Sequence, residues 1–429
     1  MTKWMTMWVA SAAFLVGGAT ADAKDPVVLK MWSMPGHDLG SEETQEKIVD
    51  AFEAKYPDIK IEITFLPQSG FADRVNTALG SGQNVPDIFP MIDNDNWRPR
   101  ALDLGPFIAA EKDFDPEMYS RQLWRNYATF KDAIVALPMG AGTNVVLYNK
   151  AVFDAAGVPY PQPDWTAQDF LDTAKKLSNP EKGIWGGDRP RDAYRTVWRN
   201  YDAQPYSDDS KTVDGYHNSP QSVAAFEWYW DLVKTAATPT PADIEVLGSQ
   251  GTGPVDLFMA GRLAMATLNQ SHLLQALKNK MDVGLVPEPA GPGSIRYSNA
   301  WSAPVAIYQG TKHPKEAWEF LKFFAGMDGQ RIAMTTGLNM FPSIPALWPE
   351  HPYAQEDAVK VLQGTLDWPQ VKDFDGAHPC FRASVRRVYQ TFELISLGKL
   401  ERSEIKASLN QDVPKMQAAL DECVKRLGN

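Results

Sequence analysis

PVVLKMW, residues 26–32, opens the segment that decides the fold class. This apolar run is typical of a strand, and Ser41 then offers an N-cap for a helix whose apolar positions Ile48 and Phe52 lie four residues apart. Residues 59–65 alternate apolar and polar side chains, which predicts a second strand. Strand, helix and strand in this order form the unit of a parallel sheet covered by helices, so the segment predicts an α/β fold.

Further strands and helices continue this pattern along the chain. Residues 87–89 and 144–148 are predicted as short buried strands. Helices are predicted at residues 167–177, after the start signal at Thr166, and at residues 314–324, where a proline occupies the first turn. The α/β pattern therefore extends over most of the chain.

The N-terminus has the features of a secretory signal peptide. A basic start at Lys3 precedes an apolar run and a small-x-small site at residues 21–23. The run is about 12 residues long, shorter than the roughly 20 that a membrane span needs. We expect a signal peptide at residues 1–23 and a soluble, exported mature protein. A buried N-terminal helix is the alternative, but it would have to accommodate Gly17 and Gly18.

Charge and length exclude some partners and suggest the domain organisation. The chain has 429 residues and a formal net charge of -11, which loss of Lys3 and Asp22 with the signal peptide leaves unchanged. An acidic balance argues against nucleic acid and anionic membrane as partners. A chain of about 400 residues favours two lobes, each with its own core.

Two cysteines, Cys380 and Cys423, lie in the last part of the chain. An exported protein meets an oxidising compartment, so a disulfide between them is expected, with two unpaired structural thiols as the alternative. Neither cysteine is near the predicted cleavage site, so a bacterial lipid anchor is not expected.

Catalytic and metal-binding signatures are missing. The sequence contains no G-x-S-x-G nucleophile elbow, no H-E-x-x-H and no glycine-rich phosphate loop. Its 6 histidines are scattered without the spacing of metal ligands. We therefore expect no metal, no cofactor and no enzymatic activity. A glycosidase needs two carboxylates across a cleft, and sequence spacing alone leaves that alternative open.

Six segments in order along the chain resemble the extracellular solute-binding proteins of ABC-type sugar importers, the group that includes maltose-binding protein. The sharpest covers residues 137–159, with Tyr148-Asn149-Lys150 and later Gly157 and Pro159, and continues to Trp165-Thr166, where the family has the opposite order. The departure leaves the helix start intact. The other five are residues 85–88, 258–265, 282–284, 299–301 and 313–321.

The resemblance implies an α/β, two-lobed periplasmic binding protein fold with a ligand cleft between the lobes. It places residues 26–140 and 297–345 in the first lobe and residues 141–296 and 346–429 in the second, with hinge strands that include residues 141–144. Closure by hinge bending is the expected motion. The implied protein is a periplasmic monomer that passes a small carbohydrate to the membrane permease subunits of an ABC importer.

A sugar needs planar polar groups for its hydroxyls and aromatic rings for its C–H faces. Open α/β sheets bind ligands at strand ends, so the expected ligand-binding residues lie in loops there. They are Trp32, Ser33, Met34, His37, Asp38, Asp93, Asn94, Trp97, Gly142, Thr143, Arg189, Asn269, Gln270, His272, Trp301, Phe341 and Arg382.

Three functions remain open from the sequence. The first is capture of a neutral sugar or sugar-like polyol. The second is capture of an anionic sugar or sugar phosphate, which Arg189 and Arg191 would favour if their guanidinium groups faced the cleft. The third is an exported carbohydrate-active enzyme, against which the missing motifs argue.

Overall fold

The opening segment forms the parallel unit that its sequence predicts. This computed structural model describes residues 25–427 apart from 37–38, 93–96, 189–196, 210, 236, 241–242, 244–252, 298–299, 337–340 and 367–379. Strand β1 (Val27–Ser33) pairs in parallel with β2 (Ile59–Phe65) along its whole length. Helix α1 (Glu42–Lys55) connects them, and the hydroxyl of Ser41 caps it by accepting from the Thr44 N–H. The predicted signal peptide lies outside the described residues.

One seven-stranded sheet runs through the molecule in the order β2-β1-β3-β9-β6-β7, with β8 also paired to β6. The pairs β1·β2 and β1·β3 are parallel, whereas β3·β9, β6·β9, β6·β7 and β6·β8 are antiparallel. The sheet is therefore mixed. The other strands are β3 (Ile88–Pro90), β6 (Leu137–Asn149), β7 (Met265–Asn269), β8 (Val283–Val286) and β9 (Ala300–Ile307).

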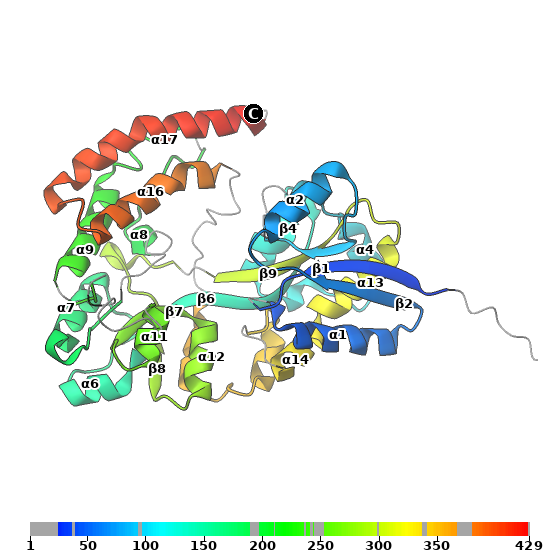
Figure 1. The fold of residues 1–429 in the computed structure, drawn as a ribbon, viewed down its shortest axis with the longest axis horizontal. Coiled ribbons are helices and arrows are strands. Elements are labelled where there is room, and N and C mark those ends of the chain that lie inside the picture. Colours follow the sequence, from blue (N-terminus) through cyan, green and yellow to red (C-terminus); the bar gives the residue numbers. More distant parts are fainter. Residues whose placement is uncertain are drawn as a thin grey trace, which may run out of the picture.

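Helices cover both faces of the β1 half, by which we mean β1, β2, β3, β9 and the helices packed on them. Successive side chains of β9 point to opposite faces of the sheet, so Val305 and Ile307 pack in one hydrophobic cluster and Ala306 packs in another on the opposite face. The first cluster includes apolar side chains of α1, α13 (Pro314–Ala325) and α14 (Met327–Thr336), and the second those of α2 (Phe71–Ser81). Figure 1 shows these helices around β1 and β2.

The β7 half, formed by β7, β8, the C-terminal part of β6 and their helices, is built in the same way. Along β6, Val146 and Tyr148 face one cluster while Val145 and Leu147 face another. The first cluster includes side chains of α7 (Ala167–Leu177), α9 (Pro220–Lys234), α16 (Phe381–Ser396) and α17 (Ile405–Leu427). The second includes those of α11 (Pro254–Met259), α12 (Gln270–Lys278) and α15 (Asp357–Thr365).

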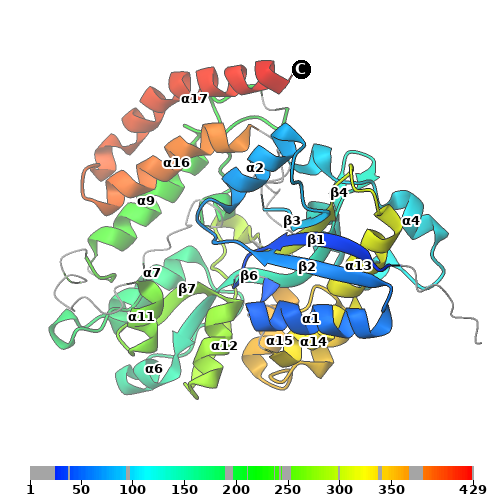
Figure 2. The same cartoon turned by 45° about the vertical axis from the view of Figure 1, so that its right-hand side comes forward.

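The chain closes with a helical hairpin that the sequence patterns do not predict. Helices α16 and α17 pack on each other and on α9, side by side in both views (Figures 1 and 2). Cys380, just before α16, forms a disulfide with Cys423 of α17, with their Cα atoms 5.6 Å apart. Both cysteines are buried, so the disulfide is part of the core of this hairpin.

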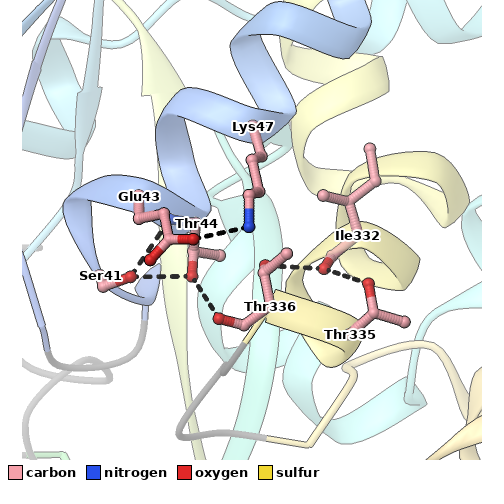
Figure 3. A network of polar contacts seen from close by, with 7 residues as sticks. All are labelled: Ser41, Glu43, Thr44, Lys47, Ile332, Thr335 and Thr336. Carbon is pink, nitrogen blue, oxygen red and sulfur yellow. Dashed lines mark hydrogen bonds and ion pairs between the residues drawn. The ribbon is translucent and has the colours of Figure 1, made fainter.

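A polar network joins the start of α1 to the end of α14. The Ser41 and Thr44 hydroxyls lie 3.0 Å apart, and the Thr44 hydroxyl donates to the carbonyl of Thr336 (3.2 Å) (Figure 3). Thr335 and Thr336 each donate to the carbonyl of Ile332. The start of α1 and the end of α14 are therefore joined by hydrogen bonds.

The remaining elements are short. No helix in the described part of the chain is both long enough and apolar enough to span a membrane.

The division into lobes at residues 26–140 with 297–345 and 141–296 with 346–429 stays a prediction. The short elements of the described residues are α4 (Gly105–Ala110), α5 (Arg121–Leu123), a π-helix (Trp124–Ala128), β4 (Thr129–Phe130), β5 (Ala133–Ile134), α6 (Lys150–Ala156), α8 (Val197–Asn200) and the 3-10 turns Arg98–Arg100, Pro116–Met118, Pro180–Lys182, Pro292–Ser294, Pro345–Glu350 and Arg402–Glu404.

Candidate functional site

Strand β6 runs from one half of the molecule into the other and changes partner on the way (Figure 1). Its pairing with β9 ends at Thr143, which lies opposite Ala300. Its pairing with β7 begins at the next residue, Asn144, which lies opposite Asn269. The hinge predicted at residues 141–144 thus includes the point where the ladder switches, and the candidate site is built around this point.

The register of β6 shifts just before the switch, between Met139 and Gly142. Gly140 has φ +76°, a left-handed conformation that favours glycine. Its carbonyl accepts from the Ser302 hydroxyl at 2.6 Å, and the N–H of Ala141 donates to the carbonyl of Phe341 at 2.5 Å. A bulge in an antiparallel ladder bends the strand, and here the polar groups of the bulge are held by neighbouring segments.

Four predicted site residues meet at the switch. A Cβ at Gly142 would lie 2.6 Å from Cε2 of Trp301 and 2.7 Å from Nε2 of Gln270, so any larger residue here would displace these side chains. The backbone N–H of Thr143 donates to Oε1 of Gln270 at 3.3 Å. Gly142, Thr143 and Gln270 are buried, whereas Trp301 is only partly buried. The first three therefore form a floor, and Trp301 keeps some surface for a ligand.

The end of β7 adds an amide and an imidazole. Asn269 caps α12, and its side chain accepts from the N–H and the hydroxyl of Ser271. Nδ1 of His272 accepts from the Asn269 N–H at 3.3 Å, and burial lowers the pKa of His272 despite the opposing charge of Asp256. Both predicted residues are partly exposed at this strand end.

The end of β1 adds an aromatic ring. Trp32 is partly buried, packed against the α2 side of the sheet. Ser33 is instead fully buried, with its hydroxyl donating to Oε1 of Gln45, and Nε2 of Gln45 donates to the carbonyl of Met34. Ser33 and Met34, expected to face a ligand, support the loop from inside, and Trp32 is the member of this group with accessible surface.

Two other predicted aromatic residues belong to cores rather than to a binding surface. Trp97 is fully buried, packs edge-on against Phe71 and Phe89, and donates its indole N–H to Asn76 at 2.7 Å. Phe341 is also fully buried. Its ring stacks on Trp348 at 4.7 Å and contacts His351 at 4.2 Å. This burial corrects the expectation that Trp97 and Phe341 contact a ligand, because neither ring has an accessible face.

The remaining predicted residues cannot be placed in this geometry. His37, Asp38, Asp93, Asn94 and Arg189 lie outside the described residues. Arg382 falls in the first turn of α16, and its side chain is outside the described part. Their contribution to the site stays a prediction.

Asp188 is a buried carboxyl that the sequence patterns did not single out. It is 2% exposed beside β7, where its Oδ1 accepts from the Thr267 N–H at 3.1 Å. Burial raises the pKa of Asp188 to about 7, against the lowering effect of that hydrogen bond. Asp188 immediately precedes Arg189, which is the residue of this segment that the sequence predicts as a candidate for ligand binding. No cluster of three or more His, Cys, Asp or Glu side chains suited to a metal occurs in the described residues.

The strand directions place the partly exposed members at one edge of the sheet. Because β1 and β3 are parallel and β9 is antiparallel to β3, the end of β1 at Trp32 and the start of β9 at Trp301 lie at the same edge of the sheet. The end of β7 at Asn269 meets β6 one residue beyond the pairing with β9. Trp301, Asn269 and His272 therefore lie beside the crossing of β6. Trp32 lies at the end of β1, two strands from β9, and packs against the opposite face of the sheet from Trp301.

Comparisons with known proteins agree with this architecture. A family model described as bacterial extracellular solute-binding protein matches residues 38–331. The chain is 22% identical over 312 residues to an erythritol/L-threitol-binding protein of Mycolicibacterium smegmatis, covering 66% of this chain and 64% of that protein.

Solved structures show the same fold. An ABC substrate-binding protein of Listeria monocytogenes in complex with cycloalternan superposes with a TM-score of 0.75 at 21% identity, covering 94% of this chain and 100% of that one. UgpB of Mycobacterium tuberculosis in complex with glycerophosphocholine gives 0.75 at 18% identity, with 94% and 100% covered. The predicted α/β periplasmic binding protein fold is confirmed.

Proposed function

The chain belongs to the bacterial extracellular solute-binding protein family, and from this premise we propose that it captures a sugar or sugar-like polyol between its two halves and delivers it to an ABC importer. The family is one of non-enzymatic binding proteins, which removes the exported carbohydrate-active enzyme as a candidate. The observation that carries the sugar assignment is the set of partly exposed side chains at one edge of the sheet, namely the indoles of Trp32 and Trp301 and the amide of Asn269.

This combination suits a polyhydroxylated ligand. Indole faces pack against C–H groups, and an amide offers both a donor and an acceptor to hydroxyls. His37, Asp38, Asp93 and Asn94 follow neighbouring strands and would add polar groups from the loops. The M. smegmatis relative binds erythritol and L-threitol, and the L. monocytogenes structure holds cycloalternan, so both ligands fit this proposal.

An anionic ligand is the second candidate. The M. tuberculosis structure holds glycerophosphocholine, a phosphate ester of a small polyol. Arg189 and Arg382 are the side chains of this chain that would pair with such a phosphate if they faced the site. This candidate shares the same strand-end site and differs only in its charged contacts.

The cellular setting follows from the same proposal. We place the mature protein in the periplasm after cleavage of residues 1–23, as a monomer that docks on the membrane permease subunits of the importer. The net charge of -11 argues against nucleic acid as a partner of this protein.

A thermal-shift screen of the mature protein tests the ligand class. The panel should hold mono-, di- and trisaccharides, polyols, sugar phosphates and glycerophosphocholine. A ligand at 100 times its Kd adds about 2.7 kcal/mol to the free energy of unfolding. A shift with neutral sugars or polyols, and recovery of the compound unchanged, supports the proposal. A shift confined to phosphate esters favours the second candidate, and no shift with any member overturns both.

Trp32→Ala then tests the site. Loss of one stacked ring is worth about 1 kcal/mol or more, so the affinity should fall roughly five- to tenfold. Trp230 of α9 is a matched control, because its ring is also partly buried but belongs to a helix of the β7 half remote from the crossing. Equal losses of affinity in Trp32→Ala and Trp230→Ala would contradict the placement of the site.

A further inference from the structure

The crossing of β6 is held by side chains of both halves. Trp301 comes from β9 in the β1 half, and Gln270 is the first residue of α12 in the β7 half. Both reach the same glycine, Gly142, whose missing Cβ leaves room for Cε2 of Trp301 and Nε2 of Gln270. Each half therefore has a side chain next to Gly142, two residues before β6 begins to pair with β7.

Gln270 also forms a hydrogen bond with the backbone of β6 at this point. Its Oε1 accepts from the Thr143 N–H, while Thr143 is fully buried and Gln270 is 2% exposed. The backbone on the other side of Gly142 is held in a similar way, since Gly140 and Ala141 bond to Ser302 and Phe341. Buried backbone groups need partners, so this segment cannot rotate until the Gln270 contact is exchanged for another.

Packing imposes the same condition as the hydrogen bonds. A rotation of β6 at Gly142 would move the backbone into the space that the indole of Trp301 and the amide of Gln270 occupy. Close-packed interiors do not deform continuously, and domain motions therefore proceed between discrete packings at a few hinge residues. Glycine at this position permits both the close contact and a change of backbone angle.

We propose that Gly142, Gln270 and Trp301 form a hinge lock that sets the angle between the β1 half and the β7 half before any ligand binds. The lock acts by positioning rather than by contact between Gln270 and the ligand. Its effect on affinity rests on the proposed binding function: the apparent Kd equals the intrinsic Kd divided by the fraction of molecules in the binding-competent arrangement. A change at Gln270 would therefore alter affinity through that fraction.

The direct test measures the distance between the halves without ligand. Spin labels at Arg74→Cys on α2 and Glu393→Cys on α16 report this distance, because both residues are exposed. The helices that carry them, α2 and α16, lie on opposite sides of the crossing (Figure 1). The two native cysteines are bonded to each other and do not take label. Gln270→Met removes the acceptor at similar size, and Gln270→Glu keeps an acceptor.

The hinge lock requires that Gln270→Met shift or broaden the distance distribution and that Gln270→Glu restore the wild-type distribution. Identical distributions in all three proteins would overturn it. If Gln270→Met does not fold, Trp301→Phe decides by the same measurement, because it removes the Cε2 and Nε1 atoms next to Gly142. These distances are measured without ligand, so failure of the carbohydrate screen would not affect them. With a ligand in hand, Gln270→Met should change the apparent Kd severalfold.

Discussion

His217 shows how a single buried side chain couples this protein to pH. It lies in the turn before α9, is fully buried, and neither ring nitrogen has a hydrogen-bond partner among the described residues. Burial lowers the pKa of His217 to about 4. The neutral ring is therefore the folded form, and a proton binds the unfolded chain more readily than the folded one.

The sign of the pH dependence follows from this lowered pKa. The stability associated with a neutral His217 is fully present above its ordinary pKa of 6.5 and is lost as the pH falls from 6.5 towards 4. The loss amounts to about 3 kcal/mol at one pKa unit per 1.36 kcal/mol. We expect His217→Leu to reduce the fall in the free energy of unfolding between pH 7 and pH 4 by that amount, measured by urea denaturation. An unchanged fall in the variant would show that His217 does not titrate with unfolding.

At the same scale, residue type and position in the sequence predicted the site only in part. Trp32 follows from its place at the end of the strand predicted at residues 26–32, whereas Asn269 and Trp301 come from segments chosen by the family resemblance. Trp97 and Phe341 also follow predicted elements, but their burial depends on partners far along the chain, such as Asn76 for Trp97. Asp188 lacks a local signal for the same reason, since its partner Thr267 belongs to another element.

Helix α7 illustrates how a short sequence signal determines the start of an element. The Thr166 hydroxyl accepts from the Asp169 N–H, and the Asp169 carboxylate accepts from the N–H and hydroxyl of Thr166, which lowers the pKa of Asp169. Removal of an N-cap costs about 1 kcal/mol. Thr166→Ala should lose about that much in the free energy of unfolding, and Thr166→Ser should retain most of it in the same denaturation assay. Equal losses in the two variants would contradict a capping role for the hydroxyl.

The hairpin of α16 and α17 depends on its covalent link. In the chain-entropy model, a cross-link across the 43-residue separation of Cys380 and Cys423 contributes about 4 kcal/mol. The double variant Cys380→Ala/Cys423→Ala should therefore unfold at a lower denaturant concentration, by up to about 4 kcal/mol. Fluorescence of the folded state at low denaturant serves as the control for intact packing. A denaturation midpoint equal to that of the parent would mean that the helices alone determine this stability.

Local patterns predicted elements unequally. Helices α7 and α13 match their predicted ranges to within one residue, because the cap at Thr166, the first-turn Pro314 and the apolar spacing are local signals. Strand β6 begins at Leu137, well before the predicted start at residue 144, because Gly140 and Gly142 resemble a loop in sequence. They instead form a bulge, and the elements that hold it, β9 and α12, lie far from it in the sequence.

At the scale of the whole molecule, two halves with separate clusters share the crossing of β6 and β9. A compact chain of this length has a radius of gyration of about 22 Å. We expect small-angle scattering of the ligand-free mature protein to give a larger value, because its two halves stand apart on either side of the crossing (Figure 1). A saturating ligand should lower that value towards the compact limit. Identical scattering with and without ligand would contradict closure of the halves.

The position of β9 in the sheet also bears on how the chain is made. Residues 300–307 insert between β3 and β6, so the sheet that β1 begins is completed only after some 300 residues have left the ribosome. Helices α13 and α14, which cover it, follow later still. A nascent chain with the predicted signal peptide would therefore stay unfolded through most of its synthesis. Late completion of the first sheet would keep the polypeptide competent for threading through a secretion channel, and folding would finish on the far side of the membrane.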